Sequence, residues 1–324
     1  MRIIIIRLMY LYIMGICINE SDPTHSDLTP YIELLTKDIT ASHISHRDID
    51  MVIDSGAVNG ITGIGALLFI DLLERRELLK INRISGCSVG SIIALWYIFG
   101  CNNDIIKVMT QMFEYYKKYN NFYIYKHMVK TMVASYFKND DMSMVNNRLF
   151  INYYDMKMFK NVIVSSYKSR KHLIRCIIKS SHVPFITSKS FKYNNRYIDG
   201  IYPYVFPDTQ CLFIQLMFLT SPIDVFCVKY EGTIYPRLFK GIDGAYNFFY
   251  NKTGHLCKYI TSDNHWINLQ FFARKYYIIS LLLVFDIFLK CINAIPPCIK
   301  ETMAYNYIKC ICIIPKNIIY KMVF

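Results

Sequence analysis

The 324-residue sequence lacks the motifs of several large protein classes. It has no Cys-x-x-Cys pair: Cys310 and Cys312 come closest, and no second pair with histidine spacing supports a zinc site. It has neither a Gly-Lys-Ser/Thr phosphate loop nor a Gly-x-Gly-x-x-Gly dinucleotide motif. Zinc-finger spacing and an aromatic, basic RNA-binding signature are also missing. We therefore expect no metal, no cofactor and no nucleic acid among the ligands.

The 11 cysteines are odd in number and scattered, which argues against a disulfide framework. Such frameworks are typical of small secreted domains, whereas this chain is long enough for one large α/β domain. We expect most of the cysteines to be reduced and buried as small apolar side chains. This pattern favours an intracellular, reducing compartment.

No apolar run reaches the length of about 20 residues that a membrane-spanning helix needs. Leu8–Ile18 is an 11-residue run after the basic Arg7, with no small-residue cleavage site behind it. A signal-like anchor and a buried first element are both open interpretations of it. Tyr276–Leu289 has 14 residues and includes Ser280 and Asp286. We expect an interfacial or core helix there.

Acidic residues are few, since 24 Asp and Glu stand against 37 Lys and Arg, for a formal net charge of +13. A basic surface favours anionic partners, either nucleic acid or the negative face of a membrane. Because no nucleic-acid module is visible, we expect an anionic membrane surface and a location peripheral to membranes. The hydrophobic content of 53% excludes a disordered chain and predicts a substantial core.

The pattern changes twice from strand to helix within about 50 residues. Ile49–Asp54 is strand-like, and apolar residues recur at helical spacing over Ile61–Leu72. Ile81–Ser85 is a second strand-like run, followed by an apolar helix over Ser88–Phe99. Two strand–turn–helix units in succession are typical of a parallel α/β sheet.

Weaker patterns predict further elements along the chain. Glu20–Thr29 is polar and has the composition of a linker. Arg170–Ser181 is a basic amphipathic helix that either lies on an anionic membrane or, as we favour, packs its apolar side on the sheet. The other predicted elements are a helix at Asp104–Lys118 and strands at Asn161–Ser166, Tyr197–Asp199, Cys211–Phe218 and Asp224–Lys229.

The sharpest feature is a serine between two glycines where the second strand turns into its helix. Composition gives a Gly-x-Ser-x-Gly pentapeptide roughly 0.03 chance occurrences in a chain of this length. A tight strand-to-helix turn pushes the serine hydroxyl out of the sheet, and the helix N-terminus points N–H groups at a developing oxyanion. We predict a nucleophile elbow with Ser88 as the nucleophile, formed by Gly86, Cys87, Ser88, Val89 and Gly90.

Two other turns contain residues that would complement a nucleophilic serine. Small residues at 55–57 allow backbone amides to face a ligand at the start of a helix, which suits an oxyanion or a phosphate. Asp199 and Gly200 follow a short strand. An isolated Asp-Gly is most often a turn. Here, however, its carboxylate could act as the base that a serine nucleophile needs to take its proton.

An ordinary hydrolase triad, in the chain order Ser, Asp or Glu, His, is an alternative to this pairing. It would leave the small-residue turn at 55–57 and Asp199 unexplained, so we rank it second. Its candidate members are Asp224 or Asp243 with His255 or His265.

In order and spacing, these three turns resemble the patatin-like phospholipase family. The oxyanion motif of that family, Asp-Gly-Gly-Gly-x-Arg/Lys-Gly, is similar to Asp54–Gly60, and its nucleophile elbow is similar to Gly86–Gly90. Its dyad motif Asp-Gly is similar to Asp199-Gly200, and Ser180–Phe185 is similar to the serine- and proline-containing stretch before that aspartate. The resemblance covers roughly residues 49–207.

The resemblance implies an α/β fold, a three-layer sandwich with a mostly parallel central sheet. It implies a serine acyl hydrolase without a catalytic histidine or a metal, in which phospholipids or other acylglycerols acylate Ser88 and Asp199 acts as the base. The oxyanion and substrate-binding residues that it implies are Gly56, Ala57, Val58 and Gly60, with Gly200 in the dyad motif.

We accordingly divide the chain into three parts. These are an apolar N-terminal segment and linker (1–47), a patatin-like catalytic core (48–210), and a remainder with strands and apolar C-terminal helices (211–324). Lipid degradation is the expected function of the core.

The oxyanion loop departs from the family motif. Ser55 and Ala57 replace two of the three glycines, so the freedom of glycine at positive φ is lost there, and Asn59 replaces the basic residue. Removing one oxyanion donor typically costs ~2.7–4 kcal/mol of transition-state stabilisation. A weakened relative that binds lipid or membrane, and a membrane-associated interaction protein without activity, are therefore alternatives to an active enzyme.

Overall fold

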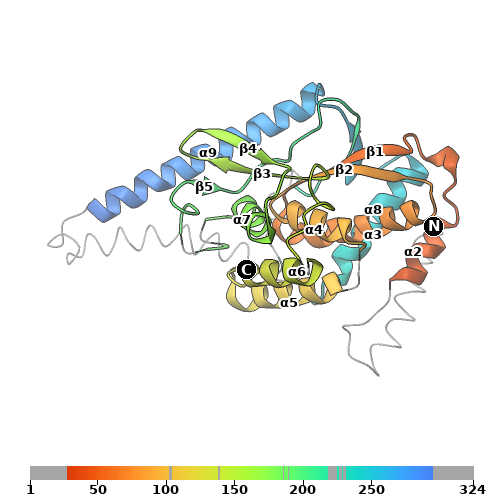
Figure 1. Cartoon of the computed structure of the whole chain (residues 1–324), viewed down its shortest axis with the longest axis horizontal. Coiled ribbons are helices and arrows are strands. Elements are labelled where there is room, and N and C mark those ends of the chain that lie inside the picture. The colour runs from red at the N-terminus through yellow and green to blue at the C-terminus, as the bar shows by residue number, and fades with distance from the viewer. Residues whose placement is uncertain are drawn as a thin grey trace.

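The computed structural model describes residues 28–101, 104–137, 139–184, 186–188, 190–217, 225, 228 and 231–294. These residues form a seven-stranded sheet with helices on both faces (Figure 1). The apolar run Leu8–Ile18 and most of the predicted linker lie outside the described residues, as does nearly all of the predicted strand Asp224–Lys229.

Four parallel strands form the centre of the sheet, and antiparallel strands form its edges. The strand order is β4-β3-β2-β1-β6-β7, and β5 pairs with β3. Neighbours among β3, β2, β1 and β6 are parallel, whereas β4, β5 and β7 are antiparallel to their partners. The predicted mostly parallel sheet is thus confirmed. The strands are β1 (Asp48–Ile53), β2 (Lys80–Cys87), β3 (Leu149–Asp155), β4 (Lys160–Val164), β5 (Tyr197–Ile198), β6 (Cys211–Ile214) and β7 (Cys257–Ile260).

Helices cover the sheet on both sides, which makes three layers (Figure 1). Successive side chains of a strand point to opposite faces. On β1, Met51 and Ile53 therefore join the core under α3 and α4, whereas Val52 packs against Ile267 and Phe271 of α9. The helices are α2 (Thr29–Thr36), α3 (Gly60–Arg75), α4 (Val89–Ile98), α5 (Asp104–Tyr119), α6 (Tyr125–Tyr136), α7 (Arg170–Ser180), α8 (Tyr235–Asn251) and α9 (His265–Ala294), with 3-10 helices η2 (Ala41–His43) and η3 (Ala57–Asn59).

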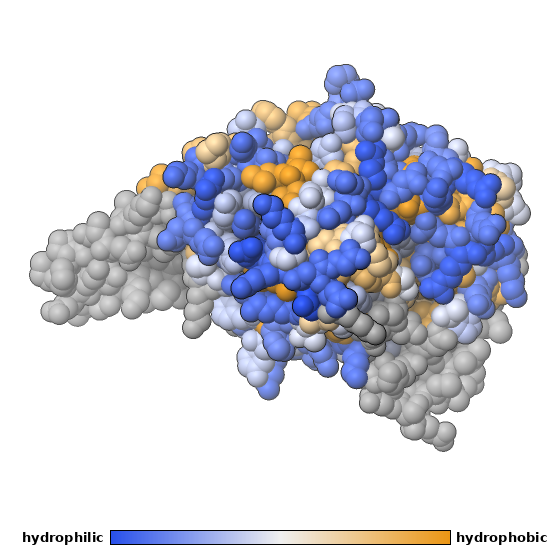
Figure 2. All heavy atoms as spheres, in the orientation of Figure 1, coloured by the Kyte–Doolittle hydropathy of each residue, from blue (hydrophilic) through white to orange (hydrophobic). Residues whose placement is uncertain are grey.

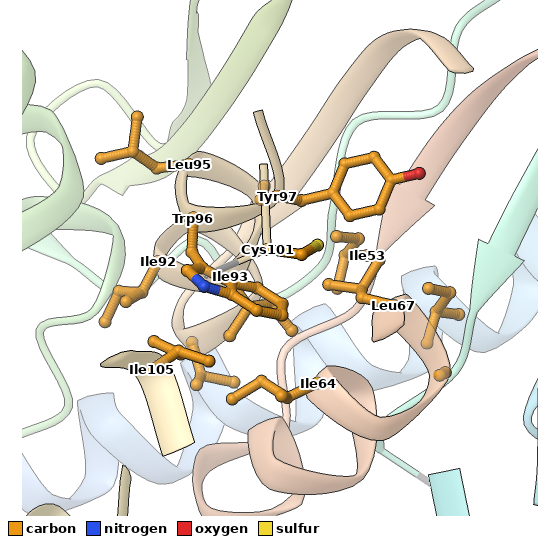
Figure 3. Close-up of a cluster of buried hydrophobic side chains, with 14 of the residues drawn as sticks. Ile53, Ile64, Leu67, Ile92, Ile93, Leu95, Trp96, Tyr97, Cys101 and Ile105 are labelled. Atoms are coloured by element: carbon orange, nitrogen blue, oxygen red, sulfur yellow. The ribbon is translucent and has the colours of Figure 1, made fainter. Parts of the chain in front are cut away.

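The main core lies between the sheet and helices α3 and α4. All residues of α4 are buried, which explains why its sequence is apolar all round rather than on one side. Trp96 of α4 lies among Ile64 of α3, Ile93 and Ile105 (Figure 3). Among the described helices, α3 with its preceding turn is apolar and long enough to cross a membrane, but 67% of that window is buried inside the protein. It is a core helix.

The predicted helix at Arg170–Ser181 is α7, which packs on β3 with Leu173, Cys176 and Ile177 buried. The packing interpretation that we favoured for its apolar side is therefore confirmed. The predicted apolar helix Tyr276–Leu289 is part of the much longer α9. The cysteines described as free thiols are all buried, as expected, namely Cys87, Cys101, Cys176, Cys211 and Cys257.

Candidate active site

Ser88 lies at the tip of the turn between β2 and α4, with 7% of its surface exposed. Its φ of 55° and ψ of −126° are values that residues other than glycine rarely adopt. The turn is packed tightly, since a Cβ atom on Gly90 would lie 2.6 Å from the Asp54 carbonyl oxygen. A strained serine on a strand-to-helix turn that only glycine neighbours allow is the geometry of a nucleophile elbow.

The segment 180–182 joins the nucleophile elbow to the loop that contains Asp199. The Ser88 N–H donates to Ser180 Oγ at 2.9 Å. The Asp199 N–H donates to the carbonyl of His182, and the Gly200 N–H to the carbonyl of Ser180, at 3.0 and 3.2 Å. Two turns more than 100 residues apart in sequence are thus fixed relative to each other by Ser180 and His182, at the end of α7.

The two oxygens of the Asp199 carboxylate differ in their hydrogen bonds. Oδ1 accepts the Ile201 N–H at 2.9 Å, and Cys87 Sγ lies 3.9 Å from it. Oδ2 is buried and makes no hydrogen bond of normal length with any described residue, although Asp199 as a whole is partly exposed. Burial raises the pKa of Asp199 to about 6, and the nearby Ser88 hydroxyl opposes this rise. At pH 7 this carboxylate is therefore mostly ionised, and it lies beside the Ser88 hydroxyl.

The oxyanion loop lies on the same cavity as Ser88, with Ala57 and Val58 in its wall. Ala57 has a φ of 42°, in the left-handed region where a glycine would be unstrained. The N–H groups of Gly56 and Ala57 bond to no described residue, whereas the Val58 N–H donates to the Val225 carbonyl at 3.2 Å. Gly56 and Ala57 are therefore the available donors. Gly60 begins α3, where a Cβ atom would overlap Val89.

A buried arginine from α9 holds the beginning of this loop. Arg274 forms a two-pronged ion pair with Asp54, with Nη1–Oδ1 and Nη2–Oδ2 distances of 2.6 and 3.2 Å. Its side chain is 5% exposed and that of Asp54 is fully buried. The same guanidinium reaches the carbonyl oxygens of Ile201, in the Asp199 loop, and Met217, at 3.4 and 3.3 Å. Arg274 thus joins the beginning of the oxyanion loop, the loop that contains Asp199, and the segment after β6.

A second arginine, Arg237 of α8, contacts the position where the family has a basic residue. It donates to Asn59 Oδ1 and pairs with Glu231, and Asn59 Nδ2 donates to the Leu216 carbonyl at 2.9 Å. A guanidinium thus lies beside Asn59, although it is paired with Glu231. Sequence reasoning missed both arginines, although Arg274 stands beside a long apolar segment, and an arginine is rarely buried unless it is paired.

The cavity beside Ser88 is lined almost entirely by apolar side chains from α3, α4, α5 and the segment after α7. Among the described residues that line it, the others with a hydroxyl are Ser181, Thr187 and Tyr125, and the buried Ser181 Oγ makes no hydrogen bond with a described residue. Such a wall suits a hydrocarbon chain better than a polar ligand. Apolar residues that line it include Ile61, Ile92, Met109, Phe113, Phe122 and Ile186.

The alternative triad is not assembled by the described residues. Asp243 accepts a hydrogen bond from the Tyr31 hydroxyl at 2.8 Å, and the exposed His255 and His265 do not line the cavity of Ser88. Asp224 lies outside the described residues. Burial lowers the pKa of His182 to about 4, so this ring is neutral at pH 7 and packs near Tyr193. No cluster of three metal-binding side chains occurs in the described part of the chain.

Residues 51–203 match the family model described as patatin-like phospholipase. This part of the chain is a patatin-like domain. No curated protein matches the chain. The matched residues include the oxyanion loop, the elbow and Asp199, so the predicted resemblance is confirmed; Arg237 and Arg274 lie beyond them. The patatin-like domain is of the lipid acyl hydrolase type in general, and its family implies lipid substrates.

Proposed function

We propose that the patatin-like domain hydrolyses ester bonds of phospholipids or other acylglycerols with a dyad of Ser88 and Asp199. One observation carries this proposal: the strained Ser88 stands beside a carboxylate with a free buried oxygen, at the wall of an apolar cavity. The cavity would hold the acyl chain, and the carboxylate would take the proton. The backbone strain accounts for the position of the hydroxyl at the tip of the turn.

In the first half of the reaction, Asp199 takes the proton of the Ser88 hydroxyl while Oγ attacks the ester carbonyl carbon. The N–H groups of Gly56 and Ala57 stabilise the tetrahedral oxyanion. When this intermediate collapses, the ester C–O bond breaks, and the leaving alcohol takes the proton from Asp199. The lysolipid or alcohol departs, and the acyl chain stays on Ser88 in the apolar cavity.

In the second half, water replaces the alcohol. Asp199 takes a proton from the water as its oxygen attacks the acyl-serine carbonyl, and the same N–H groups stabilise the second oxyanion. Collapse breaks the bond to Ser88 Oγ, which recovers its proton from Asp199. The products are a fatty acid and free enzyme, with no redox step and no metal.

The positive net charge of +13 supports an anionic membrane surface as the place of action, peripheral to the bilayer. The buried free cysteines support a location in a reducing compartment inside the cell. A second candidate function is a weakened relative that binds lipid with little turnover. The observation that favours it is the left-handed φ of Ala57, because this strain disturbs one of the two available oxyanion donors. An interaction protein without activity has no such observation in its favour.

The proposed function is tested with the purified wild-type chain and vesicles of mixed phosphatidylcholine and phosphatidylglycerol. We expect release of free fatty acid, measured by mass spectrometry, and one covalent adduct of a fluorophosphonate probe, mapped to Ser88. Heat-denatured protein serves as the control and should give neither. Vesicle binding without fatty-acid release or adduct would leave the weakened lipid-binding relative as the function.

Replacing Ala57 by glycine should raise both stability and turnover. Relief of the left-handed strain is expected to increase the free energy of unfolding by about 1 kcal/mol, and the same relief at the oxyanion loop would raise kcat up to about fivefold. Glu77→Gly is a matched control, because Glu77 has a φ of 56° in an exposed turn after α3. It should stabilise similarly and leave kcat unchanged. An unchanged kcat in Ala57→Gly would show that loop strain does not limit turnover.

A further inference from the structure

The outward side of α9 is the most apolar part of the described surface. More than half of the large hydrophobic side chains that are exposed in the described residues belong to this one helix. At about 100° per residue they fall within an arc of about 140°. Hydrophobic residues also follow the course of α9 in the space-filling view (Figure 2). The outer face of α9 consists of Trp266, Leu269, Phe272, Tyr276, Tyr277, Leu283, Val284 and Ile287.

The inner side of α9 fixes the direction of this face. Ile267 and Phe271 pack on the sheet with Val52, and Ile279 packs with β3 and β5 residues, all from the opposite arc of the helix. Arg274 is on that inner arc too, in its ion pair with Asp54. The helix therefore cannot roll its outer face into the core without breaking a buried ion pair.

The composition of the outer face matches the boundary between lipid headgroups and acyl chains. Its aromatic residues include Trp266, Tyr276 and Tyr277, whose rings combine an apolar body with a polar atom. No Asp, Glu, Lys or Arg is present among the described side chains of this arc. A face that is wide, apolar, aromatic and uncharged is typical of a helix that lies in the plane of a membrane interface.

Lysines lie beside this face and supply the charge that anionic headgroups require. Lys275 Nζ lies over the ring of Tyr154, at the end of β3, at 5.7 Å from its centroid. The turn that follows β3, residues 157–160, has the sequence Lys-Met-Phe-Lys; all four residues are exposed, with Met158 and Phe159 more than half exposed. Met156, at the base of this turn, packs with Ile279 of α9. The turn and the helix thus belong to one part of the surface.

We propose that the outer face of α9, together with the turn at residues 157–160, binds the surface of an anionic phospholipid bilayer. The apolar residues enter the boundary of the acyl chains, and Lys157, Lys160 and Lys275 pair with headgroup phosphates. A second copy of the chain is the less suitable occupant, because two molecules that each have a net charge of +13 repel each other. The inference rests on the proposed function only in that the bilayer holds the substrate.

The test is co-sedimentation of the full chain with phosphatidylcholine vesicles that contain or lack phosphatidylglycerol. The variant Leu269→Ser/Phe272→Ser/Val284→Ser should bind the anionic vesicles at least tenfold more weakly than wild type. A matched control, Leu34→Ser/Tyr119→Ser/Met144→Ser, removes exposed apolar side chains from other parts of the surface and should stay within twofold of wild type. Lys157→Ala/Lys160→Ala should lose binding to the anionic vesicles and show a weaker dependence on salt.

Three further readings separate the possible results. Equal vesicle binding by the α9 variant and wild type would overturn the inference, provided that thermal unfolding shows both to be folded. A concentration-dependent dimer that only the α9 variant loses, without vesicle binding by wild type, would assign the face to a second copy. Hydrolysis of a water-soluble short-chain ester tests the enzyme separately from the membrane. If wild type does not hydrolyse this ester, the proposed function is refuted, whereas the inference about α9 depends only on vesicle binding.

Discussion

Asp199→Asn is expected to lower fatty-acid release about 10²–10⁴-fold without unfolding the protein, because asparagine has the same shape but cannot accept the Ser88 proton. Ser88→Ala should lower release at least as much and should also abolish the phosphonate adduct. Asp243→Asn is the matched control, since Asp243 bonds to Tyr31 and lies away from the cavity. Full activity in Asp199→Asn, or loss in Asp243→Asn, would refute the proposed dyad.

The same aspartate predicts the direction of the pH dependence. The base must be ionised, and its pKa is raised to about 6 by burial, so kcat/KM should be constant above about pH 7 and fall as the pH decreases through 6. One pH unit below the pKa, about a tenth of the carboxylate is ionised, which predicts a decrease of about tenfold at pH 5. A profile that is flat between pH 5 and 8 would contradict Asp199 as the base.

Arg274→Met is expected to lower the free energy of unfolding by about 3–5 kcal/mol, because it leaves the fully buried Asp54 carboxylate without its counter-charge. Urea unfolding measures this change. Arg75→Met, which breaks an ion pair with Asp71 on the surface of α3, is the matched control and should change stability by less than about 1 kcal/mol. The double variant Asp54→Asn/Arg274→Met should recover part of the loss, since no charge then stays buried alone.

In the proposed mechanism, Arg274 also acts as a positioning residue. It contacts the oxyanion loop and the carbonyl of Ile201, whose N–H holds Asp199. Under conditions where the variant is folded, Arg274→Met should therefore reduce kcat more than KM, whereas a purely structural role would leave the folded fraction with normal kcat. Arg274→Lys keeps the charge without the two-pronged geometry, so it should recover stability better than kcat.

The elements around the nucleophile were predictable from local patterns. The expected strand at Ile49–Asp54 is β1, and the expected helix after Ser88 is α4, each within one or two residues. Strand alternation, helical spacing and glycine turns are properties of neighbouring residues, and they can be read from a short window. The same reasoning applies to position 57. The family has a glycine there, which indicates a positive φ, and Ala57 has this positive φ in the structure.

Contacts between distant segments were not predictable in this way. Nothing in the sequence around Asp54 indicates that its partner is Arg274, 220 residues later, or that Ser180 accepts the Ser88 N–H. The strand β3 and the helices α6 and α8 were also missed, although the apolar residues of α8 recur at helical spacing. A single apolar segment at Tyr276–Leu289 likewise gave no sign that α9 begins at His265 and has one side on the sheet.

The ion pair between Asp54 and Arg274 has a consequence for the order of events during synthesis. Ribosomes add about 5–20 residues per second, so roughly 10–45 seconds separate the appearance of the two partners. The nascent chain contains the whole patatin-like segment only after residue 203 has been made, and Asp54 then still lacks the guanidinium that neutralises it. The ion pair at the beginning of the oxyanion loop can therefore form only after Arg274 of α9 has been made. The last third of the chain thus supplies a buried counter-charge that a nascent polypeptide ending before α9 does not have.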